Sequence, residues 1–527
     1  MKLITYGLLC LAAFSAETCS AEGIPTPAPK RIAVIGAGAS GTSAAYFIQQ
    51  GMTNTSTPVS ITVYERSDQV GGRVNAITVP GTNLMIETGA AIFIDTNANL
   101  IKYAAQFNLT VQPAASGLSN THANPKLGIW NGTDFSFMQT GNATADQAVI
   151  VSRFGVYSIG AISQLIQSYA VQFLKVYYPA AVNGTFDTMR SILEYLGLQS
   201  TTQATAQNAL NAAIPNLNAN YLAEVVEIAT RENYGQGLAQ IHTMGMAISV
   251  VGSSGTAYQV QGGNQQVFQK LLAASGATVH LKTPVAAISK SVSATGDSEG
   301  AVQYTVTTAA GSSTDYDAVV MASPPIATTT SSNAKSSITW QNLTTPNYFT
   351  TPNALVTPPV TYRSIHVTIV AGVVNPLYFK ARSFSQLPLA IYSTQDASAT
   401  CPFTSLVVHE VLTFAQILKI AAASLYTNRS AIEPTAFFTL TKVFSPEALT
   451  ERQLARLYGA RFWTYQTSYN AYPNLVPRDE GQFPPLTVDT QLYYPNAFEP
   501  FISTMETSMI SAQNVANLLV RDLTQSA

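Results

Sequence analysis

Three glycines follow a short hydrophobic run near the N-terminus, and their spacing suits the binding of a diphosphate. Gly36, Gly38 and Gly41 form the pattern G-x-G-x-x-G after residues 32–35, and an alanine-rich helical pattern follows. In such a turn the first glycine permits a sharp change of direction. The second lets the backbone approach a pyrophosphate, and the third lets the helix pack on the strand. The N–H groups and dipole at the start of the helix then favour the negative charge.

An acidic residue stands where the ribose of a dinucleotide needs one. The sequence VSITVYER at 59–66 predicts a second strand, and Glu65 lies near its end, 24 residues after Gly41. This spacing is typical of a carboxylate that accepts hydrogen bonds from ribose hydroxyls. The alternative is a solvated charge at the end of a strand. Together, the glycines and Glu65 predict an adenine dinucleotide site without deciding between NAD and FAD.

Two further glycine-rich blocks favour FAD. Gly72 and Arg73 lie in SDQVGGR, just after the second strand, and Gly89 and Ala90 lie in ETGAAIF, after another strand-like run. An acid at a strand end followed by G-G-R and then E-x-G-A resembles the FAD-binding pattern of the glutathione-reductase-like oxidase superfamily. In that superfamily the arginine and the small residues lie along the pyrophosphate and the flavin. The combination is far more specific than the first glycine pattern alone.

The same resemblance gives roles to residues farther along the chain. The segment QLYYPNAFEPFISTMETSMISAQNVANLLVRDL at 491–523 begins polar and aromatic and then becomes regularly helical. FAD oxidases of this architecture direct the N-terminus of a final helix at the flavin edge where negative charge develops on reduction, which implies such a place for Met505 and Glu506. An ordinary amphipathic terminal helix is the alternative. The backbone of Val285 is expected to contact the adenine. Because the C-terminal segment contains neither cysteine nor histidine, FAD is expected to be held without a covalent bond.

The order of the segments predicts an α/β protein made of two interleaved domains. A Rossmann-like FAD-binding domain of the glutathione-reductase-like oxidase type is expected from residues 31–100, 255–330 and 456–527. An interleaved α+β substrate domain is expected from residues 101–254, where the pattern is helical, and from residues 331–455. Two domains agree with the length of 527 residues, which is too great for one compact core.

The composition excludes several classes of function and suggests a compartment. The formal charge of −2 gives no reason to expect nucleic acid as a partner, and three cysteines give no reason to expect a metal site. Residues 1–21 combine Lys2 with a short apolar run, which predicts a signal peptide; no later segment reaches membrane-spanning length. Seven N-x-S/T sequons agree with a glycoprotein of the secretory pathway, either secreted or lysosomal or vacuolar: Asn54, Asn108, Asn131, Asn142, Asn183, Asn342 and Asn428.

Blocks spread over nearly all of the mature chain resemble the prenylcysteine oxidase (prenylcysteine lyase) family. The most specific are RENYGQ at 231–236 and YYPNAFE…STMET at 493–507. The resemblance implies a secreted or lysosomal FAD-dependent thioether oxidase. Such an enzyme converts farnesyl- or geranylgeranylcysteine, with molecular oxygen, to cysteine, a prenyl aldehyde and hydrogen peroxide. The family usually has a tryptophan before AYP, where this chain has Tyr469 and Asn470.

The candidates for catalysis come from the first of these blocks and its surroundings. Tyr234 is a candidate for the flavin face, and His242 is a candidate for a side chain that approaches the flavin, although a buried histidine with satisfied hydrogen bonds is common. Arg231 either binds a substrate carboxylate or pairs with Glu224 or Glu227. Two other functions stay open. One is another secreted flavin oxidase acting on an amine or a terpenoid alcohol, and the other is a flavin-binding protein without turnover.

Overall fold

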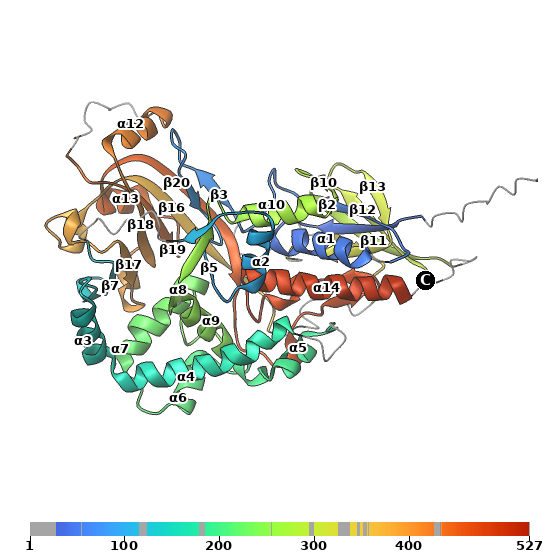
Figure 1. Ribbon diagram of the computed structural model, residues 1–527, viewed down its shortest axis with the longest axis horizontal. Helices are drawn as coiled ribbons and strands as arrows, with labels where there is room; N and C mark the ends of the chain where they lie inside the picture. The colour runs from blue at the N-terminus through green and yellow to red at the C-terminus, as the bar shows by residue number, and fades with distance from the viewer. Residues whose placement is uncertain are drawn as a thin grey trace, which may run out of the picture.

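The computed structural model of the chain describes residues 28–53, 55–114, 124–178, 185–254, 256–294, 300–324, 338–344, 348–350, 356, 358–425, 433 and 435–525. The expected signal peptide lies outside these residues, and so do Asn54, Asn183 and Asn428. Figure 1 shows an elongated molecule in which segments from the beginning and the end of the chain lie together on one side.

A six-stranded sheet contains the strand that leads into the glycine motif. Its order is β10–β2–β1–β14–β22–β21, and all neighbours are parallel except β21, which pairs antiparallel with β22. The central strands are hydrophobic at nearly every position because both faces of the sheet are covered. The strands are β1 (Lys30–Ile35), β2 (Val59–Tyr64), β10 (Thr278–His280), β14 (Ala318–Met321), β21 (Thr487–Asp489) and β22 (Leu492–Tyr493).

Helices and a second sheet pack on this sheet and share its hydrophobic core. The helices are α1 (Ala39–Met52), α2 (Ala98–Gln106), α10 (Gln265–Ala274) and α14 (Met505–Gln525), and α1 packs along α14 (Figure 1). The second sheet has the order β13–β12–β11–β15, with β11 (Val285–Val292), β12 (Val302–Thr308), β13 (Ser313–Tyr316) and β15 (Thr339–Gln341). The Rossmann-like α/β domain expected from the sequence is thereby confirmed.

A seven-stranded sheet forms the other half of the molecule. Its order is β20–β16–β19–β18–β17–β7–β8, with β7 (Leu127–Trp130), β8 (Phe135–Met138), β16 (Tyr362–Val374), β17 (Ala390–Ser393), β18 (Ser405–Leu412), β19 (Phe438–Ser445) and β20 (Tyr458–Pro473). Helices α12 (Phe414–Ala423) and α13 (Glu451–Leu457) each begin at a threonine capping box. Smaller sheets connect the two halves: β3 (Ala76–Thr78) with β4 (Met85–Glu87), and β5 (Phe93–Ile94) with β9 (Ala257–Val260) and β6 (Val111–Pro113).

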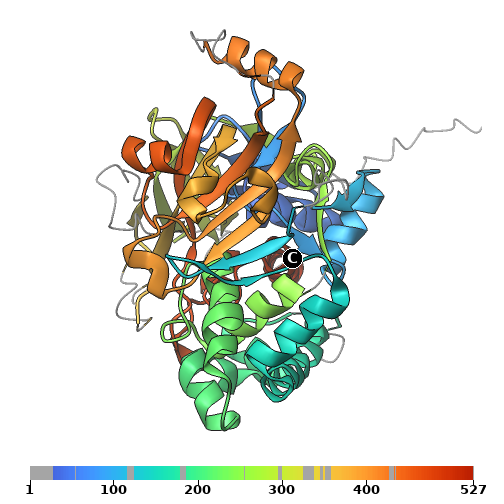
Figure 2. The same ribbon diagram turned by 90° about the vertical axis from the view of Figure 1, so that its left-hand side faces the viewer.

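A group of helices lies against the seven-stranded sheet (Figure 2). They are α3 (Ala143–Phe154), α4 (Val156–Phe173), α5 (Met189–Leu196), α6 (Ala206–Ala213), α7 (Ala219–Tyr221), α8 (Glu227–Tyr234) and α9 (Thr243–Ser254). A π-helical turn, Leu222–Val226, joins α7 to α8. Within the described part of the chain, no single helix has the length and hydrophobicity needed to cross a membrane, although the bent pair of α3 and 156–177 meets that criterion jointly.

The structure shifts one of the expected domain boundaries and changes the expected secondary structure of another segment. The sequence assigns residues 456–527 to the FAD-binding domain, but β20 pairs with β16 along its length in the seven-stranded sheet. The chain rejoins the six-stranded sheet only at β21. Residues 127–138, expected within a helical segment, form β7 and β8 of the seven-stranded sheet. Hydrogen bonding to distant strands decides these assignments, and the local pattern does not contain that information.

Candidate active site

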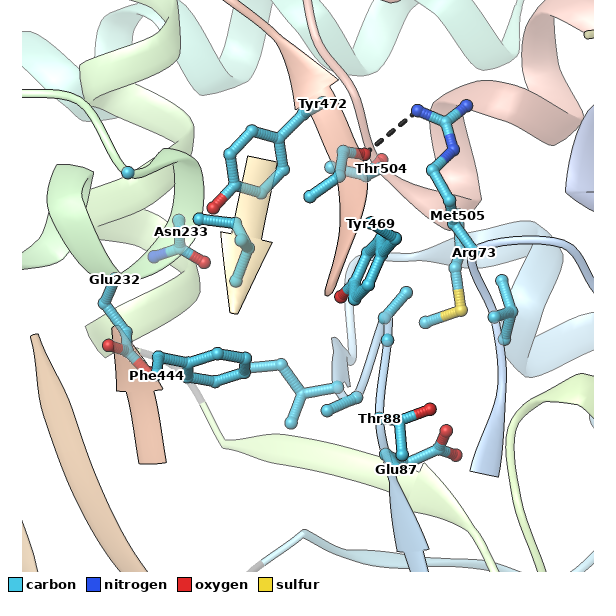
Figure 3. A pocket seen from close by; sticks show the side chains of 18 of the residues that line it. Arg73, Glu87, Thr88, Glu232, Asn233, Phe444, Tyr469, Tyr472, Thr504 and Met505 are labelled. Atoms are coloured by element: carbon cyan, nitrogen blue, oxygen red, sulfur yellow. Dashed lines mark hydrogen bonds between the residues drawn. The ribbon is translucent and has the colours of Figure 1, made fainter. Parts of the chain in front are cut away.

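One cavity of about 2540 Å³ runs between the two halves of the molecule. The glycine motif and the blocks around Gly72 and Gly89 line one part of it. Helix α8 and strands β18, β19 and β20 line the other part, and Figure 3 shows side chains from both parts. The cavity therefore connects the predicted dinucleotide site with the predicted substrate domain.

The glycine motif has the conformation that a dinucleotide turn needs. Gly36 has φ of +107°, a region that favours glycine. A Cβ on Gly41 would lie 1.9 Å from the carbonyl oxygen of Gly36, so only glycine lets α1 approach the turn this closely. Gly36, Gly38 and the first residues of α1 line the cavity, while Gly41 lies behind them. The turn presents backbone and a helix N-terminus to the cavity, as a pyrophosphate requires.

Glu65 is held beside this turn. Its Oε2 accepts a hydrogen bond from the Ala37 N–H at 2.8 Å. Its Oε1 accepts from the Ser67 N–H and from the Ser67 hydroxyl, both at 2.8 Å. The side chain is buried in protein and lines the cavity. These contacts fix the carboxylate at the end of β2, where a ribose attached to the pyrophosphate would lie.

Replacing Glu65 with alanine is expected to weaken FAD binding by about 1.5–3 kcal/mol, because a ribose loses a charge-assisted acceptor. The measurement is the Kd for FAD from fluorescence titration of the apoprotein. Ser67→Ala is the control, since it leaves the carboxylate in place, and we expect a smaller change. Equal Kd values for wild type and Glu65→Ala would remove Glu65 from the site.

Arg73 lies in a buried network that fixes its position. The guanidinium forms two hydrogen bonds with the Glu499 carboxylate and donates to the Ala471 carbonyl at 3.0 Å. The Tyr362 hydroxyl donates to Glu499 at 2.8 Å. Burial alone would lower the pKa of Arg73, but the adjacent Glu499 carboxylate outweighs it and the pKa is raised. Arg73 is thus a permanent cation in the cavity wall, beside Gly72.

The two glycine-rich blocks pack on each other through their backbones. A Cβ on Gly89 would lie 1.9 Å from the Arg73 carbonyl oxygen, which also accepts from the Ala90 N–H at 3.0 Å. Glu87 accepts a hydrogen bond from the Asn264 N–H at 2.6 Å through Oε1, and burial raises its pKa to about 7. Lys442 donates to the Glu87 carbonyl at 3.3 Å. The blocks thus form a continuous wall of small residues along the cavity.

At the start of α14, two predicted cofactor residues point in different directions. The helix begins at Met505, as expected, and Met505 lines the cavity together with Thr504 (Figure 3). Glu506 does not line it. Its carboxylate accepts from the N–H groups of Asn99 and Leu100 at 2.8 and 3.0 Å, at the N-terminus of α2. Successive helix residues point about 100° apart, which accounts for the difference.

Most of the predicted cofactor residues meet in one place. Those in the cavity wall are Gly36, Gly38, Glu65, Gly72, Arg73, Gly89, Ala90, Val285 and Met505. Their arrangement fits FAD: a glycine turn for the pyrophosphate, a fixed acid for the ribose, and a helix N-terminus at the far end. Among the described residues, no group of histidine, cysteine, aspartate and glutamate side chains has the arrangement of a metal site.

Comparisons with known proteins agree with this geometry. Residues 137–527 match the model of the family described as prenylcysteine lyase, and residues 34–107 match the NAD(P)-binding Rossmann-like domain. The chain belongs to the prenylcysteine lyase family. It is 27% identical to farnesylcysteine lyase of Arabidopsis thaliana, over 95% of this chain and 90% of that protein. It is 26% identical to human prenylcysteine oxidase 1, over 93% of this chain and 88% of that protein.

Solved structures of flavin oxidases share the fold of this prenylcysteine lyase family member. Cyclohexylamine oxidase from Brevibacterium oxydans superimposes with a TM-score of 0.55, at 14% identity, over 94% of this chain and all of that chain. Putrescine oxidase superimposes with a TM-score of 0.54 at the same identity. These similarities show the fold, and the family match confirms FAD as the expected cofactor.

The structure places neither candidate catalytic residue of this family member in the cavity wall. His242 is fully buried; its Nε2 contacts the Pro500 carbonyl at 3.1 Å, and its Nδ1 accepts from the Gly245 N–H at 3.1 Å. Burial lowers the pKa of His242 to about 4. The Tyr234 ring packs edge-on against Tyr472 with centroids 5.3 Å apart. Both side chains contact other parts of the protein and not the cavity, and we propose no catalytic role for them.

Among the described residues, Arg231 forms neither of the two ion pairs that the sequence suggested. Arg231 donates to the Ser393 carbonyl at 2.5 Å. Glu224 pairs with Arg153, and Glu227 accepts from the Leu238 N–H at 3.3 Å. Arg231 also lines the cavity, so its contact with a substrate carboxylate stays a prediction.

Several cavity residues of this prenylcysteine lyase family member were not anticipated as site residues. They are Glu87, Glu232, Tyr362, Arg363, His409, Lys442, Phe444, Tyr469 and Tyr472. Several of them stand in segments that carry the resemblance: Glu87 in ETGAAIF, Glu232 in RENYGQ, Lys442 and Phe444 in TKVFS, and Tyr472 in NAYPNL. Tyr469 directly precedes the last of these segments. Their places in these segments are a signal that could have singled them out.

That FAD binds here without a covalent bond to the protein stays a prediction. Cys401, the cysteine of the described residues, is buried with its thiol 3.4 Å from the Phe403 carbonyl and is not part of the cavity wall. Acid precipitation of the purified protein should therefore release the yellow flavin into the supernatant. Colour retained in the pellet after washing with denaturant would contradict this expectation.

Proposed function

We propose that this chain oxidises the thioether of a prenylated cysteine, such as farnesyl- or geranylgeranylcysteine. The balanced reaction consumes one prenylcysteine, one dioxygen and one water. It yields one cysteine, one prenyl aldehyde and one hydrogen peroxide. Family membership and the names of the curated relatives support the substrate class. The observation that carries the proposal is that one continuous cavity joins the expected FAD site to an extensive apolar wall.

The apolar wall suits an isoprenoid chain. It combines residues of β7 and β8 with residues of α3, α4 and the helix from α7 to α8: Ile129, Phe137, Ile150, Phe154, Ile159, Tyr221, Val225 and Ile228. Each methylene transferred from water to such a wall contributes about 0.8 kcal/mol. A farnesyl group would therefore gain most of its binding free energy here, and a small amine would gain little.

The chemistry of the substrate requires no protein base at the carbon that is oxidised. The carbon bonded to sulfur is allylic and next to a thioether, so both neighbours stabilise positive charge as a hydride leaves. Water then adds to that carbon, and the carbon–sulfur bond breaks to leave the thiol on cysteine. When bound, FAD supplies the two-electron oxidation and passes the electrons to dioxygen.

The residues of the chain would hold and orient the reactants. The N-terminus of α14, at Met505, presents the positive end of a helix dipole to the cavity, which favours negative charge there. Arg73 is held nearby as a fixed cation by Glu499. Phe444, Tyr469 and Tyr472 line the space beside them (Figure 3). Aromatic faces exclude water and attract the positive charge that develops next to sulfur.

The test is to incubate the flavin-loaded enzyme with farnesylcysteine in air and to quantify farnesal, cysteine and peroxide. We expect equal amounts of the three products. S-Hexylcysteine is the matched control, since it has the thioether but neither the allylic carbon nor the long chain, and we expect little turnover. Turnover of amines or prenyl alcohols without turnover of farnesylcysteine would reject the proposal in favour of the other oxidase class.

We also propose that the protein enters the secretory pathway and resides outside the cell or in a lysosome or vacuole. The support is the N-terminal sequence together with sequon asparagines that are exposed: Asn108, Asn131, Asn142 and Asn342. Treatment of protein from a eukaryotic host with an endoglycosidase should reduce its mass. An unchanged mass, with the N-terminus starting at Met1, would contradict this localisation.

A further inference from the structure

Glu232 presents an unpaired carboxylate oxygen inside the cavity. It lies near the end of α8, and Figure 3 shows it on the side opposite Arg73 and Met505. Its Oε2 is buried and has no hydrogen-bond partner among the described residues. The Ser405 hydroxyl lies on the same side without forming a hydrogen bond of regular geometry. Burial raises the pKa of Glu232, and the nearby charges of Lys442 and Arg231 offset this only in part. A buried carboxylate oxygen without a hydrogen bond is costly, and an N–H donor from a ligand would remove that cost.

Arg363 presents an unpaired cation to the same part of the cavity. It is the second residue of β16, and its neighbour across the strand pair is Tyr472 of β20. Its guanidinium end lies against Gly235, where α8 ends. No hydrogen bond or ion pair joins it to another described residue, although it lines the cavity. A guanidinium offers five N–H donors in a geometry that matches a carboxylate.

Tyr472 connects the two charges. Burial is the main cause that raises the pKa of Tyr472; the charge of Glu232 adds to this rise and the charge of Arg363 opposes it, so both residues lie within electrostatic reach of the Tyr472 hydroxyl. Figure 3 shows the hydroxyl directed toward the side where Glu232 and Asn233 lie. Yet Glu232 and Arg363 form no ion pair with each other. A carboxylate and a guanidinium that line one cavity without pairing leave room for a ligand that carries both a positive and a negative charge.

We propose that Glu232 binds the ammonium and Arg363 the carboxylate of an α-amino acid head group, which makes these two residues the determinants of the cysteine part of the substrate. This inference rests on the proposed thioether oxidation and specifies how its substrate is oriented. With the head group between α8 and β16, the thioether extends toward Tyr469 and Met505. The prenyl group of the substrate then contacts the apolar wall. A prenyl alcohol or a simple prenyl thioether has no head group to satisfy either charge.

The experiment compares three thioethers with wild-type and variant enzymes. They are farnesylcysteine, 3-(farnesylthio)propanoic acid, which lacks the amino group, and farnesylcysteamine, which lacks the carboxylate. In the wild type we expect kcat/KM to fall about tenfold or more when either group is removed, mostly through KM. Glu232→Gln should remove the discrimination against the compound without the amino group but keep the discrimination against farnesylcysteamine. Arg363→Gln should do the reverse, and Arg363→Lys should restore part of it.

Glu227→Gln is the matched control, because Glu227 lies on the same helix but already accepts a backbone hydrogen bond. We expect it to discriminate as the wild type does. FAD content and melting temperature of each variant show whether it is folded. Discrimination that is equal in wild type and Glu232→Gln, with farnesylcysteine still oxidised, would overturn this inference alone. Failure of the wild type to oxidise any of the three thioethers would overturn the proposed function as well.

Discussion

Glu499→Ala is expected to lower the free energy of unfolding by about 3 kcal/mol, because it removes one partner of a buried charge pair. The Glu499 side chain is 4% exposed and holds both Arg73 and Tyr362. Its loss leaves a cation and a hydroxyl without their acceptor in the middle of the molecule. Glu499→Gln should be less destabilising, since the amide oxygen still accepts from Tyr362. Urea denaturation followed by tryptophan fluorescence measures both changes.

The control for this prediction is a pair of the same types at the surface. Glu451 pairs with Arg461, but its side chain is 80% exposed. Exposed pairs contribute roughly 0–1 kcal/mol, so Glu451→Ala should change the stability very little. Equal losses in the two alanine variants would show that the Arg73–Glu499 pair is not a buried structural element.

Gly41→Ala is expected to raise the Kd for FAD about 100-fold, which corresponds to about 3 kcal/mol. The new Cβ would lie 1.9 Å from the Gly36 carbonyl oxygen, and a backbone atom cannot move aside as a flexible side chain can. Helix α1 must therefore separate from the turn, which disrupts the place where the pyrophosphate binds. The measurement is reconstitution of the apoprotein with FAD, together with the flavin content after purification.

Gly160→Ala is the matched control, since it makes the same change in another helix. A Cβ at Gly160 of α4 would meet no atom within 4 Å. We expect unchanged FAD binding and a stability gain of up to about 1 kcal/mol, because alanine favours helix over glycine. A Gly41→Ala protein that binds FAD as tightly as the Gly160→Ala protein would contradict the assignment of the turn.

The glycine turn and Glu65 could be placed in one cavity from the sequence because they belong to a short segment with local constraints. The turn from Gly36 to Gly41 is specified by its own glycines, and Glu65 follows at the distance that one helix and one strand require. The FAD-specific blocks at Gly72 and Gly89 are recognisable from their resemblance to the superfamily pattern, and the structure shows why glycine is needed there, because the backbones pack closely. In these places the local conformation and the tertiary packing require the same residue types.

Other parts of the site depend on residues that are far apart in sequence. Arg73 and Glu499 are separated by 426 positions, and neither local sequence predicts that the two side chains pair. The resemblance to FAD oxidases implies a place at the cofactor for Glu506 as well as Met505, but rotation about the helix axis directs Glu506 to α2. His242 could be named from its motif, but its burial against Pro500 depends on packing between distant segments. The pairing of β20 with β16 likewise depends on segments that are far apart in sequence.

The most direct test of the account is an anaerobic titration of the flavin-loaded enzyme with farnesylcysteine, followed by the visible absorbance of the flavin. Without oxygen, electrons taken from the substrate stay on the cofactor, so the readout is independent of peroxide assays. The account predicts complete loss of the visible absorbance with one equivalent of farnesylcysteine, and its return with the release of peroxide when air is admitted. An unchanged spectrum with farnesylcysteine, alongside rapid bleaching by an amine or a prenyl alcohol, would contradict it.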